Sequence, residues 1–151
     1  MIRSYRPSDS DAVIDVWAAA SDVVHPFLSR EFRASERRDI ADVHLPTAET
    51  WVWVVEEQVV GFIAMVGDEI GGLFVHPDHH GQGIGRALVD HMRDSHDRLE
   101  VEVFKENWLG RGFYSAYGFV EDHESIHSAT GFKVLRLSLP RIRSRSRDGG
   151  G

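Results

Sequence analysis

The sequence predicts an α/β protein of the α+β kind, built on a mixed and mostly antiparallel sheet. Two observations lead to this prediction. Strand-forming residues separated by short turns occupy residues 51–75, a pattern that is typical of consecutive hairpins. A glycine-rich turn and an amphipathic helix follow at 81–95, and further strand patterns come after them. Because hairpins precede a single strand–helix–strand–helix unit, we expect both strand directions in the sheet.

Local signals place the elements along the chain. Residues 7–11 offer N-cap side chains, and apolar residues recur at helical spacing over 13–21. Pro26 interrupts this helix, because proline disfavours helix in the residue before it. Residues 99–103 alternate apolar residues with glutamates, as a half-buried strand does. We expect strands at 2–5, 51–55, 59–66, 70–75, 99–103, 118–123 and 132–139, and helices at 13–21, 31–43, 84–95 and 107–117.

Composition narrows the class of protein. The 151 residues are 42% hydrophobic and 27% charged, which is ordinary for a globular domain. A net charge of −7 argues against attraction of the whole chain to nucleic acid or to an anionic membrane. The absence of cysteine excludes disulfides, thiolate metal sites and a cysteine nucleophile, and agrees with a cytoplasmic location. No apolar run approaches the ~20 residues of a membrane span, and the first residues lack the apolar core of a signal peptide.

The end of the chain has a different composition. Residues 140–151 are rich in arginine and then in glycine. Such a segment has almost no apolar surface to bury, so we expect a disordered tail after a domain at residues 1–139. The tail is either an arm for an acidic partner or a solvated end, and we favour the second interpretation.

The glycine-rich turn is the most informative segment. Gly81, Gly83 and Gly85 lie between a strand and a helix, where bare backbone and unpaired N–H groups favour a phosphate or pyrophosphate. A P-loop would need lysine and then serine or threonine after its last glycine, but Arg86 and Ala87 follow. A dinucleotide-binding turn would need its third glycine three positions after Gly83, where arginine stands instead. We therefore expect a phosphorylated cofactor bound in a different way.

Two segments together carry a family resemblance. Residues 80–85 read His-Gly-Gln-Gly-Ile-Gly, and residues 107–119 read Asn-Trp-Leu-Gly-Arg-Gly-Phe-Tyr-Ser-Ala-Tyr-Gly-Phe. They resemble the patterns Gln/Arg-x-x-Gly-x-Gly/Ala and Asn-x-x-Ala-x-x-Phe-Tyr-x-x-x-Gly-Phe of the GNAT (GCN5-related) N-acetyltransferases. His80 and Gly110 depart from these patterns. The resemblance covers about residues 1–139 and implies a GNAT fold of about six or seven strands and about four helices.

This resemblance implies how a cofactor would be held. Members of the family transfer acetyl directly from acetyl-coenzyme A (acetyl-CoA) to an amine in a ternary complex, which needs no cysteine. The glycine turn would bind the pyrophosphate, and the backbone of Phe74 and Val75 would pair with the pantetheine arm, with Val75 N–H polarising the thioester carbonyl. Asn107 would hydrogen-bond the arm, cap a helix, or do both. The predicted cofactor-binding residues are Phe74, Val75, His80, Gly81, Gln82, Gly83, Ile84, Gly85, Arg86, Asn107 and Tyr114.

The catalytic residues are predicted in the same way. Tyr114 matches the tyrosine that protonates the thiolate of coenzyme A, and Tyr117 replaces it if the helix is rotated. For the general base, Glu69 matches the glutamate of the histone acetyltransferase branch but lies in an expected turn. His25 is the alternative, since histidine titrates near neutrality, and a water chain with no single base is the third.

The sequence also bears on a metal site and on the acceptor. His76, His79 and His80 are close in sequence, but adjacent side chains point in different directions, so we expect no metal. The acceptor is an amine on a small molecule or a protein, which the scaffold does not identify. Homodimers are common in the family, although no feature of the sequence requires one. The alternative to an enzyme is a non-catalytic acyl-CoA-binding or sensor module.

Overall fold

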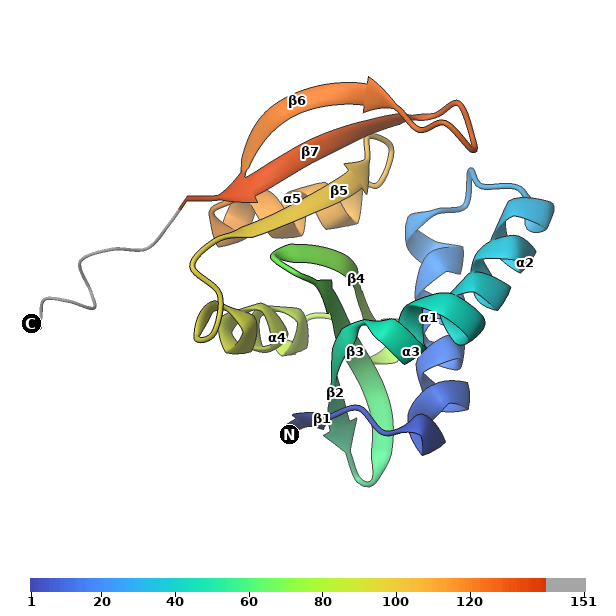
Figure 1. The fold of residues 1–151 in the computed structure, drawn as a ribbon, viewed down its shortest axis with the longest axis vertical. Helices are drawn as coiled ribbons and strands as arrows, with labels where there is room; N and C mark the ends of the chain where they lie inside the picture. Colours follow the sequence, from blue (N-terminus) through green and yellow to red (C-terminus); the bar gives the residue numbers. More distant parts are fainter. Residues whose placement is uncertain (141–151) are drawn as a thin grey trace, which may run out of the picture.

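Seven strands form one sheet in residues 1–140, which are the residues that the structure, a computed structural model, describes (Figure 1). Their order across the sheet is β1-β2-β3-β4-β5-β7-β6, and only the pairing of β4 with β5 is parallel. The predicted α/β fold with a mixed, mostly antiparallel sheet is therefore confirmed. The strands are β1 (Ile2–Ser4), β2 (Glu49–Val55), β3 (Gln58–Val66), β4 (Glu69–Val75), β5 (Leu99–Phe104), β6 (Val120–Ile126) and β7 (Lys133–Leu139).

Helices cover both faces of the sheet. The helix α1 (Ser10–Val24) packs with α2 (Arg30–Asp39) and α3 (Leu45–Thr47) on one side of β1–β4, and α4 (Ile84–Arg93) packs on the other (Figure 1). The helix α5 (Trp108–Tyr117) lies under β5 and β7. Short turns of other helix types lie at η1 (Pro7–Asp9), η2 (Ile40–His44) and η3 (Pro77–His79). Within residues 1–140, no helix combines the length and apolar character that a membrane span requires.

The buried residues form two cores, one on each face of the sheet. One core lies beneath α1 and includes Val13, Trp17 and Phe62. The larger core lies beneath α4 and α5 and includes Leu88 and Met92. Because β3 contributes to both cores, it fixes the helices of the two faces relative to each other.

The structure corrects two predictions of local structure. The helix predicted at 31–43 ends at Asp39, and η2 and α3 continue the helical path, so Pro46 lies inside a short helix instead of a connector. Proline is tolerated there because the first turn of a helix leaves its N–H groups unpaired. Glu69, expected in a turn, is the first residue of β4 and lies opposite Val66. The predicted tail at 140–151 lies outside the described residues except for Pro140.

The sheet divides between β4 and β5. These strands pair only at Glu69–Glu100 and Ile70–Val101, although both continue further. The pairing ends at Gly71, where an extra residue in β4 forms a bulge against β3. A bulge bends the strand that carries it. The edge of β4 from Gly71 to Val75 is consequently unpaired on the side of β5.

A buried carboxylate joins β1 to the start of α1. Asp9 is 7% exposed and accepts hydrogen bonds from Arg3 Nη1 at 2.8 Å and Nη2 at 3.0 Å. Its Oδ2 also accepts the N–H of Arg6 at 2.8 Å. These hydrogen bonds, that of Arg3 above all, hold the pKa of Asp9 below its ordinary value. The contact fixes the first turn of α1 against the sheet edge.

Replacing the Asp9 carboxylate should destabilise the protein at pH values above the range in which Asp9 titrates. Since the folded pKa is lowered, the stabilisation is present above the unfolded pKa of about 4 and is lost as pH falls through the folded value. We expect Asp9→Asn to lower the free energy of unfolding at pH 7 by about 1–3 kcal/mol in urea titrations. The difference from wild type should shrink below pH ~4. Asp11→Asn, at an exposed position of α1, is the control with a smaller effect. Equal effects of the two variants would contradict this role of Asp9.

Candidate active site

A cavity of about 910 Å³ opens where β4 and β5 separate. Its walls come from both faces of the sheet. On one face they include Trp17 of α1 and Phe32 of α2, and on the other Ile84 of α4 and Tyr114 of α5. A ligand bound along the unpaired edge of β4 would therefore be reached from either face.

The glycine turn forms one end of this cavity. Gly81 and Gly83 have φ of +78° and +80°, a left-handed conformation that disfavours other residues. Gly85 packs against a ring, since a Cβ there would lie 3.3 Å from Phe113. The first N–H with a helical partner is that of Ala87, which donates to Gly83 at 3.0 Å. The amides of residues 84–86 precede it without a helical partner, so the turn fits a pyrophosphate.

His80 ties this turn to the end of β4. Its Nε2 lies 2.8 Å from the carbonyl oxygen of Val75, so the ring donates the hydrogen bond. His76 N–H donates to Val60 of β3 at 2.8 Å. Because successive strand residues direct their backbone groups to opposite edges, Val75 presents its N–H and carbonyl to the open edge. The residue that departs from the family pattern thus fixes the strand end where Val75 N–H is predicted to meet the thioester.

Asn107 caps α5 and binds His25. Its Oδ1 accepts the N–H of Gly110 at 2.8 Å, and its Nδ2 lies 3.3 Å from His25 Nε2. A Cβ at position 110 would lie 2.6 Å from Asn107 Nδ2. Glycine in place of the family's alanine is therefore explained by the side chain folded over it. The capping role predicted for Asn107 is present, and its contact with pantetheine stays a prediction.

His25 is an electrically neutral member of an aromatic cluster. Its ring lies 5.8 Å from Phe27, 6.2 Å from Phe74 and 5.2 Å from Phe104, measured between centroids. Burial, with a smaller contribution from Arg33, lowers its pKa to about 4. Because the neutral Nε2 accepts from Asn107, the ring proton is assigned to Nδ1. A neutral imidazole with this lone pair engaged is poorly arranged to take a proton from an ammonium.

The two tyrosines of α5 differ in the state of their hydroxyls. Tyr114 is 6% exposed, and within residues 1–140 its hydroxyl makes no hydrogen bond. Burial raises its pKa, which keeps the phenol protonated. The Tyr117 hydroxyl donates to Asp90 Oδ1 at 2.5 Å. Both rings line the cavity, but only Tyr114 has an uncommitted proton.

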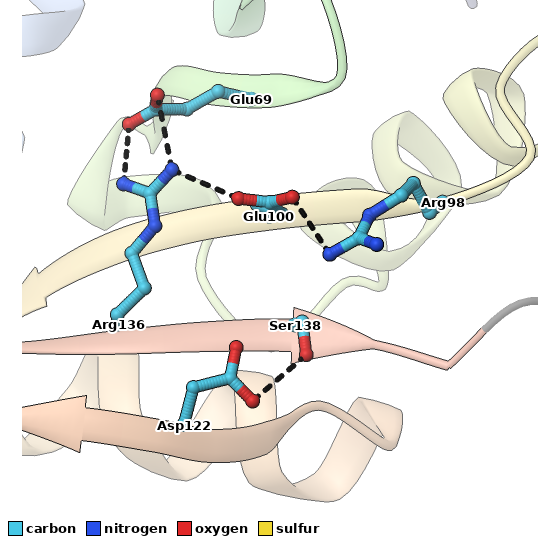
Figure 2. Close-up of polar contacts among 6 residues, drawn as sticks. All are labelled: Glu69, Arg98, Glu100, Asp122, Arg136 and Ser138. Carbon is cyan, nitrogen blue, oxygen red and sulfur yellow. Dashed lines mark hydrogen bonds and ion pairs between the residues drawn. The ribbon is translucent and has the colours of Figure 1, made fainter.

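Glu69 lies at the closed end of the division between β4 and β5. Both Nη atoms of Arg136 donate to its carboxylate, at 3.0 and 3.3 Å (Figure 2). Arg136 also donates to Glu100 at 2.9 Å, and Arg98 binds the other oxygen of Glu100 at 2.7 Å. Glu69, which was expected in a turn, is thus part of a chain of ion pairs. His25 lies at the opposite, open end, so the structure does not bring the two predicted bases together.

The wall of the cavity that α2 provides contains residues that the sequence did not single out. Phe32 and Glu36 of α2, with Ile40 just beyond, line the cavity at helical spacing. Phe32 lies 5.8 Å from His127, whose ring is 5.1 Å from Phe104. The four-residue spacing on a polar helix was the available signal. Among the described residues 1–140, no three His, Asp or Glu side chains converge as a metal site.

Known proteins match this chain in both sequence and fold. A family model described as an acetyltransferase (GNAT) domain matches residues 46–121. The peptidyl-lysine N-acetyltransferase YjaB of Escherichia coli (strain K12) is 37% identical over 119 residues, covering 78% of this chain and 80% of the relative. YiaC, a peptidyl-lysine N-acetyltransferase of the same strain, is 31% identical over 120 residues, covering 79% and 82%.

Solved structures agree with these sequence matches. The solution structure of apo YjaB from Escherichia coli superposes with a TM-score of 0.83 at 32% identity, covering 94% of this chain and 98% of that one. A Bacillus anthracis (strain Ames) protein in complex with acetyl coenzyme A shares the fold over 63% of each chain, with a TM-score of 0.58 and 16% identity. The chain belongs to the GNAT family of acetyltransferases. It is an acyltransferase that uses acetyl-CoA to acetylate an amine.

The neutral state of His25 predicts a pH dependence of stability. Because its folded pKa lies below the ordinary value, the unfolded chain takes up a proton first as pH falls from about 6.5 toward 4. Folding stability in wild type should therefore decrease over this window, by on the order of 2 kcal/mol between pH 6.5 and 5. In urea titrations, the free energy of unfolding of His25→Gln should not show this part of the decrease with falling pH. His123→Gln, at an exposed position, should retain it, and a wild-type slope in His25→Gln would contradict the assignment.

Proposed function

We propose that this enzyme transfers acetyl from acetyl-CoA directly to the ε-amine of a lysine in a protein or peptide. One observation carries the proposal: a single cavity joins the glycine turn and Tyr114 on one face of the sheet to the aromatic wall of α2 on the other. Two substrates can thus meet at the open edge of β4. The names of YjaB and YiaC as peptidyl-lysine N-acetyltransferases support lysine as the acceptor.

We propose that backbone amides hold the cofactor. The pyrophosphate lies at the amides of Gly81 to Arg86, where the dipole of α4 adds positive potential. The pantetheine arm follows the unpaired edge of β4, and Val75 N–H donates to the thioester carbonyl oxygen. The hydrogen bond from His80 to the Val75 carbonyl supports this role, because it fixes the peptide that precedes the glycine turn.

Proton movements complete the reaction. The ammonium of the acceptor loses one proton, and its nitrogen then attacks the thioester carbonyl carbon. As the C–N bond forms and the C–S bond breaks, sulfur leaves with the electron pair and takes the proton of the Tyr114 hydroxyl. The nitrogen loses its second proton, so one proton returns to Tyr114 and one reaches solvent. Glu69 is bound by Arg136 and His25 Nε2 accepts from Asn107, so we assign the first proton to neither.

The test begins with cofactor binding and a lysine peptide. Acetyl-CoA at ~100 times its dissociation constant should raise the free energy of unfolding by about 2.7 kcal/mol, a shift of at least several degrees in Tm. NADH, as control, should give no shift. A lysine peptide should gain one acetyl group by mass spectrometry. A Tm shift with acetyl-CoA, but no acetyl transfer to any amine, would favour the non-catalytic sensor instead.

Removing the Tyr114 hydroxyl should slow the chemical step. Tyr114→Phe is expected to lower kcat about a hundredfold, because the leaving thiolate loses its proton donor. The Tm shift with acetyl-CoA should stay at the wild-type value. Tyr117→Phe is the matched control and should lose stability through Asp90 with little change in kcat. An unchanged kcat in Tyr114→Phe would exclude this tyrosine as the acid.

The cytoplasmic location and the homodimer stay predictions. We propose the roles of the individual site residues in the same way, and substitution of each residue tests its role. The uncommitted hydroxyl of Tyr114 supports turnover over the sensor alternative.

A further inference from the structure

Three carboxylates line the cavity in residues 1–140, and their surroundings differ. Glu69 is neutralised by Arg136 in a bidentate ion pair. Glu102 of β5 is exposed to solvent. Glu36 of α2 is half-buried and, within residues 1–140, has neither an ion pair nor a hydrogen bond. It is therefore the partly desolvated carboxylate of the cavity that has no cation of its own.

The surroundings of Glu36 include aromatic rings. Phe32 lies one turn before it on α2 and packs edge-on against His127 of the β6–β7 connection. Burial raises the pKa of Glu36, His44 and His127 oppose this rise, and Asp39 adds to it. The neighbouring cation on α2, Arg33, is ion-paired with Asp22. A half-buried carboxylate without a partner is costly unless something else neutralises it.

The geometry points to Glu36 as the residue that selects a cationic acceptor, by binding its ammonium group. This inference rests on the proposed function and names the residue that recognises the substrate. An ammonium at this position regains Coulomb energy that solvent screens less than at an exposed carboxylate such as Glu102. The rings of Phe32 and His127 offer an apolar wall for the methylenes of a lysine side chain.

The same contact gives the ammonium proton a destination. The proton passes from nitrogen to a Glu36 carboxylate oxygen and then to solvent, which leaves the amine neutral for attack. Burial favours this transfer because it raises the carboxyl pKa toward that of the amine. Glu36 thereby supplies a step for which neither Glu69 nor His25 is free.

The experiment compares two acceptors that differ in charge. One peptide carries lysine, and the other carries 4-aminophenylalanine, whose aromatic amine is uncharged at pH 7. Glu36→Gln should lower kcat/KM for the lysine peptide about tenfold or more, the factor that ~1.4 kcal/mol corresponds to. The aminophenylalanine peptide should change by no more than about twofold, since it has no charge to recognise and no ammonium proton to remove. Glu31→Gln on the exposed side of the same helix is the control and should match wild type.

Several results would overturn the inference. These are an unchanged kcat/KM for lysine in Glu36→Gln, an equal loss for both peptides, or a larger loss in Glu102→Gln. The Tm shift with acetyl-CoA verifies that each variant is folded and binds cofactor. Glu36→Asp keeps the charge and should retain more activity toward lysine than Glu36→Gln, and equal losses would argue against charge.

The proposed function and this inference fail in different ways. A wild-type protein that binds acetyl-CoA and acetylates neither peptide would refute the proposed acceptor, and with it the role of Glu36. A wild-type protein that acetylates lysine, together with a Glu36→Gln variant that does so equally well, would refute the role of Glu36 alone.

Discussion

The early end of the pairing between β4 and β5 is the constraint on which the site depends. Backbone N–H and C=O groups need partners when they are buried, and a strand edge left open at the centre of a sheet presents them to a ligand. The bulge at Gly71 ends the parallel pairing after two residue pairs. The open edge then lets α4 and α5 approach from one face and α1 and α2 from the other, so that one cavity is lined from both faces of the sheet.

Polar contacts join neighbouring segments at both ends of the division between β4 and β5. Arg136 binds Glu69 and Glu100 at the closed end, across three strands (Figure 2). At the open end, the contact of His25 with Asn107 joins the segment after α1 to the start of α5. The Tyr114 hydroxyl and the Glu36 carboxylate, which both line the cavity, make no hydrogen bond within residues 1–140. Groups with satisfied hydrogen bonds thus hold the frame, and groups with unused hydrogen-bonding capacity line the cavity.

Much of the fold, and the local geometry of the glycine turn and of the α5 cap, could be predicted because their signals are local. The positive φ of Gly81 and Gly83, the cap at Asn107 and the alternation at 99–103 all act within a few residues. Tyr114 was predicted as the acid from its place in a contiguous pattern, and that role is a proposal. The role of Glu69 was not predictable, because Arg136, its partner, lies 67 residues away in the chain.

By itself, the sequence determined the order of elements, the family and the glycine turn, since periodicity and turn chemistry are properties of neighbouring residues. Only the tertiary structure decided which carboxylates and imidazoles are engaged. His25 and Asn107 are 82 residues apart, and their contact depends on how α1 and α5 meet across the sheet. Burial and ion pairing set the charge state of a side chain and its unused hydrogen-bonding capacity. Burial and ion pairing in turn depend on packing between distant segments. The chemistry of Glu36, Glu69 and His25 is for that reason a property of the folded chain.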